Sequence, residues 1–289
     1  MMSLSLDRTG SSCRRPGAGL LLVLALAVAG APAGTRAQSA SETSVMPHRA
    51  AYELRLASGG EAEFIDVSGE MAFEWADSCD GWSVTQRTRM NFEYRTGVSL
   101  ELGWSLTSWE SKDGSQYRFQ LKQYENGAVS EELRGDATLN GDAGGDEGGM
   151  AHYIKPEVQD VELPAGTIFP TTHSFAIVVA AQQGMERLWA QLFDGTTDNG
   201  LYEVGAVILP RAEDLELSEA LDPELVEGHE GWRVDLAFYE FGSPDSIPTH
   251  EQTIWLFDNG IVDRMTLDYG DFTVDGKLIR FEVLPEPVC

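Results

Sequence analysis

Apolar and polar residues alternate with a period of two over most of the chain from Ala51 onward. In the first such run Tyr52, Leu54 and Leu56 share one face, and polar residues occupy the positions between them. Successive side chains of a strand point to opposite faces of a sheet, so this alternation predicts strands that are buried on one side. The same pattern recurs over residues 67–75, 82–92, 98–109, 117–121, 128–133, 188–193, 202–209, 232–241, 253–257, 262–269 and 277–284.

Glycine-containing turns separate these runs. Residues 112–114, 125–127 and 258–260 end in Asp-Gly or Asn-Gly, dipeptides that accept the positive φ of tight hairpins. Another turn, at 77–81, carries a cysteine. The acidic, glycine-rich stretch at 140–149 predicts a mobile loop whose role stays open. A calcium-binding loop is the alternative there, although the spacing fits neither an EF-hand nor a nonapeptide array.

One segment departs from the period of two. Residues 171–184 are rich in alanine and valine, with Thr171 or Thr172 available as the N-cap and Gly184 as the end of a helix. His173 lies at the start of this helix, where we expect a structural hydrogen bond rather than catalysis, because no partner for a nucleophile–base pair is evident. About a dozen short strands and one helix predict a mainly β fold, an antiparallel barrel or curled sheet.

The first 37 residues have the features of a secretory signal peptide. A basic start precedes an apolar run over residues 20–29, and small residues follow up to Ala37. The apolar run is shorter than the roughly 18 residues that span a membrane, with an uncleaved anchor as the alternative. We expect residues 1–37 to be removed on export to the periplasm. Residues 38–289 then form a single domain without a transmembrane segment, in which residues 38–47 are a disordered lead-in.

The exported part is strongly acidic. The whole sequence has 20 Lys and Arg residues against 47 Asp and Glu residues. Residues 1–37 hold four of the basic residues and one of the acidic residues, which leaves 16 against 46. Such a charge favours solubility, and it repels nucleic acids and anionic membrane surfaces. We therefore expect no nucleic-acid partner.

Two cysteines, Cys79 and Cys289, remain after export, since Cys13 precedes the apolar run. In an oxidising compartment such a pair normally forms a disulfide. A free thiol at the last residue of the chain would be exposed and readily oxidised. A disulfide would bring the C-terminus back to a turn near the beginning of the domain. Two free thiols or an intermolecular bridge are the alternatives.

Residue patterns of common periplasmic enzymes are missing from the sequence. It contains no Gly-x-Ser-x-Gly, Ser-x-x-Lys, His-Glu-x-x-His or Cys-x-x-Cys. The five histidines have no metal-ligand spacing, and carboxylates are too numerous for a pair such as Glu240 and Asp245 to be specific. We predict no catalytic residues, no cofactor and no metal, with an envelope-polymer hydrolase as the least favoured alternative.

The tryptophans are the remaining candidates for a binding site. Large aromatic side chains can line an apolar cavity inside a barrel, but they also dominate ordinary cores, which is the interpretation that we favour. The candidates for a cavity lining are Trp75, Trp82, Trp104, Trp232 and Trp255, with Trp109 as a further member of the set.

Several segments spread over the exported part together match the pattern of one family. They are His48–Leu56, Cys79–Trp82 with Gln86 and Arg87, Leu163–Thr167 with Phe169–His173, Leu267–Phe272, and Leu284-Pro285 followed by Cys289. Each segment is short, but their order and the two cysteines are specific. In these segments the chain resembles the EipB-like family, the envelope integrity proteins of alphaproteobacteria.

The resemblance implies a periplasmic, spiral-like β-sheet that forms an open barrel with one inserted α-helix, closed by the disulfide between Cys79 and Cys289. It also implies a role in cell-envelope integrity under stress, with a periplasmic tetratricopeptide-repeat protein as a partner, and it transfers no catalytic residues. We therefore predict a non-enzymatic periplasmic protein that acts by binding a protein partner. The alternative is a carrier or sensor of a lipid or other apolar ligand within the barrel.

Overall fold

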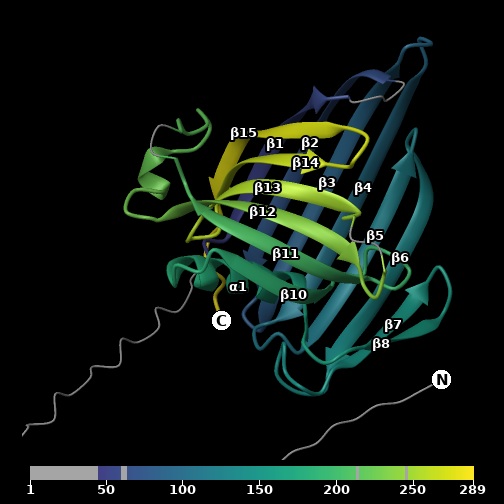
Figure 1. Ribbon diagram of the computed structural model, residues 1–289, viewed down its shortest axis with the longest axis vertical. Coiled ribbons are helices and arrows are strands. Elements are labelled where there is room, and N and C mark those ends of the chain that lie inside the picture. Colours follow the sequence, from purple (N-terminus) through teal and green to yellow (C-terminus); the bar gives the residue numbers. More distant parts are fainter. Residues whose placement is uncertain (1–44, 60–63, 213–214, 245–246) are drawn as a thin grey trace, which may run out of the picture. The chain divides into compact units, whose positions relative to one another are not determined.

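The computed structural model describes residues 45–59, 64–212, 215–244 and 247–289, so the expected signal peptide over residues 1–37 lies outside the described residues. Within these ranges 15 strands form one continuous sheet in the order β8-β7-β6-β5-β4-β3-β2-β1-β15-β14-β13-β12-β11-β10-β9 (Figure 1).

The elements follow one another along the chain with short connections. The strands of the first half are β1 (His48–Ser58), β2 (Phe64–Asp77), β3 (Gly81–Tyr94), β4 (Ser99–Ser111), β5 (Gln116–Glu125), β6 (Ala128–Leu139), β7 (Gly149–Lys155) and β8 (Gln159–Leu163). The second half consists of β9 (Thr167–Ile168), helix α1 (Pro170–Gln182), β10 (Arg187–Phe193), β11 (Leu201–Pro210), the 3-10 turn η1 (Pro223–Leu225), β12 (Gly231–Glu240), β13 (His250–Phe257), β14 (Val262–Asp268) and β15 (Thr273–Val283).

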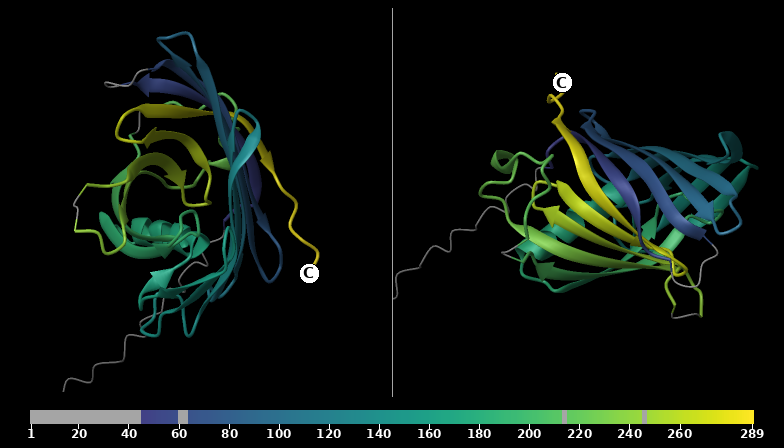
Figure 2. Two further views of the ribbon diagram at one scale, coloured as in Figure 1. Left: turned by 90° about the vertical axis from the view of Figure 1, so that its right-hand side faces the viewer. Right: turned by 90° about the horizontal axis from the view of Figure 1, so that it is seen from above.

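Strand β1 joins the two halves of the sheet, because it pairs with β2 on one side and with β15, the last strand, on the other. All neighbouring strands are antiparallel except β9 and β10, which are parallel. The predicted alternation sets the two faces: Tyr52 and Leu54 are buried, whereas Arg49 and Arg55 are exposed. Figure 2 shows the sheet curling back on itself with α1 inside the curve. The predicted antiparallel open barrel with one inserted helix is therefore confirmed.

The barrel has one unsealed seam, between the edge strands β8 and β9, which do not pair with each other. The loop between β6 and β7 lies beside β9, since Gly144 donates its N–H to the carbonyl of Thr167 and Gly166 donates to the carbonyl of Gly145. Across the seam the hydroxyl of Tyr153 donates to the carbonyl of Thr197, at 2.8 Å. The acidic loop over residues 140–149 therefore belongs to the wall at the open seam.

Helix α1 takes its N-terminal partner from another strand. The N-cap position is Phe169, whose side chain cannot accept a hydrogen bond, and neither threonine that follows acts as the cap. Instead the carboxylate of Glu110 on β4 accepts the N–H groups of Thr171 and Thr172 at 2.7 and 2.8 Å, and the Thr172 hydroxyl as well. A carboxylate at this end also complements the helix dipole. Glu110 thus fixes the helix against the inner face of the sheet.

The inward-facing side chains form three packed clusters. One lies under β1, β2, β3, β14 and β15, one holds α1 against β10–β13, and one fills the space between β5–β8 and β10 at the seam. Aromatic rings dominate the third cluster, where Tyr117 stacks on Phe169 with ring centroids 5.2 Å apart. Residues of α1 belong to only one of the three clusters, that with β10–β13.

The disulfide between Cys79 and Cys289 is present in the structure, with Cα atoms 5.8 Å apart and a sequence separation of 210 residues. Cys79 lies in the turn between β2 and β3, and Cys289 ends the tail that follows β15. The tail therefore returns to a turn in the first third of the described chain, as the sequence predicts.

Two local features differ from the sequence-based expectations. Residues 149–168 hold three strands that the alternation did not reveal, because β7–β9 are short and depend on pairing with their neighbours. Val45, placed by the sequence in a disordered lead-in, is 3% exposed, and Met46 donates its N–H to the carbonyl of Asn259. The chain is thus held from Val45 onward.

Candidate functional site

The inner tryptophans pack against other side chains. Trp75 and Trp82 contact each other at 6.1 Å between ring centroids. Both also contact Phe175 of α1, at 5.9 and 5.6 Å. The helix therefore occupies the space that these two rings face.

The other three candidate tryptophans are dispersed. Trp104 packs against the cluster under β1–β3, and Trp232 belongs to the cluster around α1. Trp255 pairs in register with Arg233, whose side chain is exposed, so Trp255 lies on the outer face of the sheet. The structure thus brings Trp75 and Trp82 together and separates the remaining candidates from them.

The buried ionisable groups near α1 have structural roles. Glu110 caps the helix, and burial raises the pKa of its carboxyl group. Burial also lowers the pKa of His173 to about 4. The Nε2 atom of His173 is buried without a hydrogen-bond partner in the described part of the chain, so the expected structural hydrogen bond is not made at this atom. The hydroxyl beside Glu110, that of Thr172, is part of the helix cap.

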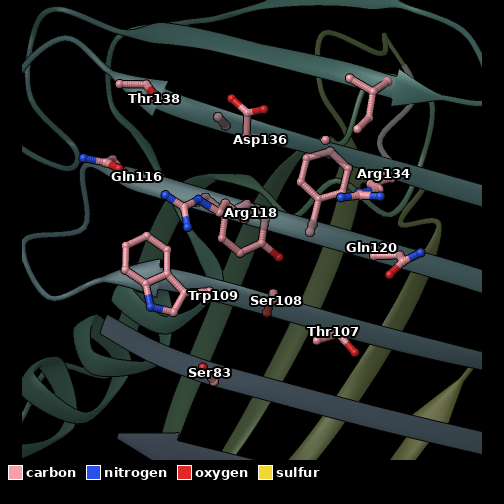
Figure 3. A pocket seen from close by; sticks show the side chains of 15 residues that line it. Ser83, Thr107, Ser108, Trp109, Gln116, Arg118, Gln120, Arg134, Asp136 and Thr138 are labelled. Carbon is pink, nitrogen blue, oxygen red and sulfur yellow. The ribbon is translucent and has the colours of Figure 1, made fainter. Parts of the chain in front are cut away.

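The outer face of the sheet carries two hollows. The first, of about 580 Å³, crosses β4, β5 and β6 and reaches Ser83 of β3 and Ile154 of β7. Figure 3 shows its lining, in which polar and charged side chains predominate. The labelled residues are Ser83, Thr107, Ser108, Trp109, Gln116, Arg118, Gln120, Arg134, Asp136 and Thr138.

Trp109 and Arg118 lie side by side in the lining of this first hollow. The guanidinium carbon of Arg118 lies 4.8 Å from the centre of the Trp109 ring, an attractive cation–π contact. The Trp109 ring is held in place by its Nε1–H, which donates to Ser78 at 3.1 Å. Arg118 pairs in register with Asp136 on β6 but makes no ion pair among the described side chains. Its N–H donors are therefore free to bind another molecule.

A second hollow of about 360 Å³ lies on the same face, over β15, β1, β2 and β3. Its floor includes the small side chains of Ala51 and Ala72, and its rim carries Arg49, Arg87 and Arg280. Arg49 is bound to Glu74 at 2.5 Å, whereas no ion pair to Arg87 or Arg280 occurs within the described ranges. The two hollows together form a candidate binding face with unpaired arginines.

The groups that line the two hollows are suited to binding another molecule. The hollows offer guanidinium donors, amide groups, hydroxyls and an indole ring, but no nucleophile with a base beside it. Across the described residues, no group of three or more His, Cys, Asp and Glu side chains is arranged to hold a metal ion. The helix that the structure describes is also too short to cross a membrane.

The sequence contained a weak signal for this face. In β1–β6 the outward positions carry arginines such as Arg87, Arg118 and Arg134, interspersed with small residues and carboxylates. Which arginines lack a carboxylate partner depends on the register between strands, and the register follows from pairings across the whole sheet. The sequence pattern therefore does not predict this candidate binding face, and it points to the tryptophans instead.

The chain is similar to known proteins both in sequence and in fold. The chain is 28% identical over 256 residues to the "Cell envelope integrity protein EipB" of Brucella abortus (strain 2308), covering 86% of this chain and 87% of that protein. A crystal structure of a beta-barrel-like protein of a domain of unknown function from Brucella abortus superposes with a TM-score of 0.75 at 26% identity, covering 84% of this chain and 99% of that one.

The family model extends this likeness over nearly the whole chain. It matches residues 39–285, which include every described strand and the helix. Only the segment before residue 39 and the last four residues, among them the disulfide partner Cys289, fall outside the match. The protein belongs to the EipB-like family.

Proposed function

We propose that this protein supports the integrity of the cell envelope as a periplasmic, non-enzymatic protein that binds a protein partner through the outer face of β15 and β1–β7. The name of the Brucella relative supports the envelope role. The observation that carries the binding role is the set of outward arginines without carboxylate partners, which line both hollows. A tetratricopeptide-repeat protein is the partner class that the family resemblance implies.

The packing of the inner face favours this proposal over an apolar ligand inside the barrel. A carrier needs space between apolar walls, but the rings of Trp75 and Trp82 lie against Phe175 of α1. The two hollows described above have polar, charged linings and open to the outside. Protein recognition through arginine and tryptophan is common at interfaces, where both residues are enriched among the energetically important contacts.

Affinity purification from periplasm, with the disulfide intact, tests this proposal. We expect a discrete protein to be recovered with the wild-type chain and to be lost when Arg118→Glu and Arg134→Glu are combined, because both changes place a carboxylate at the first hollow. The matched control is Arg95→Glu with Arg187→Glu, two exposed arginines away from both hollows. Failure to recover any specific protein, or equal recovery by both double variants, would contradict the proposal.

A further inference from the structure

The arginines of the second hollow are arranged around a floor of small residues. Along one register row, Arg280 of β15 pairs with Ala51 of β1, Ala51 with Ala72 of β2, and Ala72 with Arg87 of β3. Three steps between strands separate the two arginines, about 14 Å at the usual strand spacing. The alanines leave the space between the two long side chains open, so both guanidinium groups can reach a group that lies over the floor.

A second register row connects this hollow to the first. It runs from Arg49 through Glu74, Thr85, Thr107 and Gln120 to Arg134 on β6. Thr85 lines the second hollow and its neighbour Thr107 lines the first. The two hollows therefore adjoin where β3 meets β4, and together they extend over the strands from β15 to β6, roughly 30 Å at the usual spacing. We call the two together the arginine track.

The charge of the arginine track contrasts with that of the chain. Arg87, Arg118, Arg134 and Arg280 make no ion pair with any described carboxylate, although acidic residues outnumber basic ones by 47 to 20. Elsewhere on the sheet, Arg89 is paired with Glu101 and Arg233 with Asp235, whereas Arg187 has no ion pair among the described residues. A guanidinium group binds a carboxylate through two parallel hydrogen bonds, so an unpaired arginine in a hollow is an unused site for one.

From this juxtaposition we propose that the arginine track binds an extended acidic segment of a polypeptide. The inference rests on the proposed function and names the chemistry of the partner. Carboxylates of the segment pair with Arg280 and Arg87 at one end of the track and with Arg118 and Arg134 at the other. The small residues between them form a floor on which the backbone of the segment lies.

The mixed walls of the track favour a peptide over a uniform polyanion. Glu74 and Glu282 line the second hollow, and Asp136 lines the first. These carboxylates repel a chain of closely spaced phosphates or an anionic membrane surface. They accept hydrogen bonds from the backbone N–H groups of a peptide, whose acidic side chains are spaced far enough apart to meet the arginines.

Fluorescence anisotropy with a labelled peptide of alternating Glu and Ser residues tests the inference on the disulfide-bonded protein. Each lost charged hydrogen-bonding pair is worth about one to two powers of ten in affinity. Arg87→Gln combined with Arg280→Gln should therefore weaken binding by at least about tenfold. The control, Arg95→Gln with Arg187→Gln, removes the same charge elsewhere and should change binding by less than about twofold. Thermal melting confirms that both double variants fold.

Equal weakening in both double variants, or no measurable binding by wild type, overturns the inference. Tighter binding of polyphosphate than of the peptide overturns the assignment to a polypeptide. The proposed function can be contradicted independently of this inference. Recovery of a partner that does not depend on Arg87 and Arg280 leaves the partner role standing without the acidic segment. Peptide binding that depends on these arginines, with no partner recovered from periplasm, supports the chemistry of the track and counts against the partner role.

Discussion

His173, in the first turn of α1, is the histidine on which burial has the largest described effect. His173 is 6% exposed, and its Nε2 atom has no hydrogen-bond partner among the described atoms. Burial lowers its pKa to about 4, from 6.5 in an unfolded chain. Between these two pH values the unfolded state binds a proton that the folded state does not. His173 therefore makes the fold less stable as the pH falls from 6.5 to 4.

We predict that His173→Leu removes this pH-dependent loss in the free energy of unfolding, which amounts to at most about 3 kcal/mol. Burial raises the pKa of Asp194 to about 6, so this carboxyl group has the opposite effect and stabilises the fold as the pH falls through the same range. Urea unfolding of wild type and of His173→Leu, at neutral pH and near pH 4, measures the change in the free energy of unfolding. The variant should gain stability relative to wild type only at the lower pH, and an identical gain at both values would contradict the assignment.

At the scale of elements, the sequence predicts what depends on local pattern. Strands such as β3 and β12 follow from their alternation, and α1 from its composition and its end at Gly184. The cap of α1 could not be predicted, because Glu110 is about 60 residues away along the chain and reaches the helix only through the packing of β4. The arginine track could not be predicted for the same physical reason, since it depends on the register of seven strands.

The hydrogen bonds between Glu110 of β4 and the first turn of α1 give a prediction at this scale. Glu110→Ala removes the acceptor of three hydrogen bonds and leaves two helix N–H groups without a partner. We expect a loss of about 2–4 kcal/mol in the free energy of unfolding. The matched control is Glu74→Ala, which breaks the exposed ion pair with Arg49 and should cost less than about 1 kcal/mol. Equal losses in chemical denaturation would mean that Glu110 does not anchor the helix.

At the scale of the whole domain, the curled sheet brings the two halves of the chain together through β1, and the disulfide ties the tail to the turn after β2. This link closes a loop of more than two hundred residues. The sequence indicated the pairing because only two cysteines remain after the expected cleavage. It did not indicate that the seam lies elsewhere, between β8 and β9, where the β6–β7 loop and the Tyr153 side chain, rather than the disulfide, make hydrogen bonds across the opening.

Loss of the disulfide should therefore lower stability without changing the order of strands. Cys289→Ser is expected to cost roughly 2–5 kcal/mol and to lower the melting temperature. Differential scanning calorimetry of the variant beside oxidised and reduced wild type measures the effect. Equal melting of all three samples would show that the tail contributes nothing to stability.

The central claim is that the outer face of β15 and β1–β7 meets a protein partner, and site-specific photocrosslinking in the periplasm tests it most directly. A photoreactive residue replaces Thr107, on the floor of the arginine track, or Val207, which is 41% exposed on the outer face of β11. We expect a discrete cross-linked protein from position 107 and none from position 207. No adduct at position 107, or the same adduct from both positions, would contradict it.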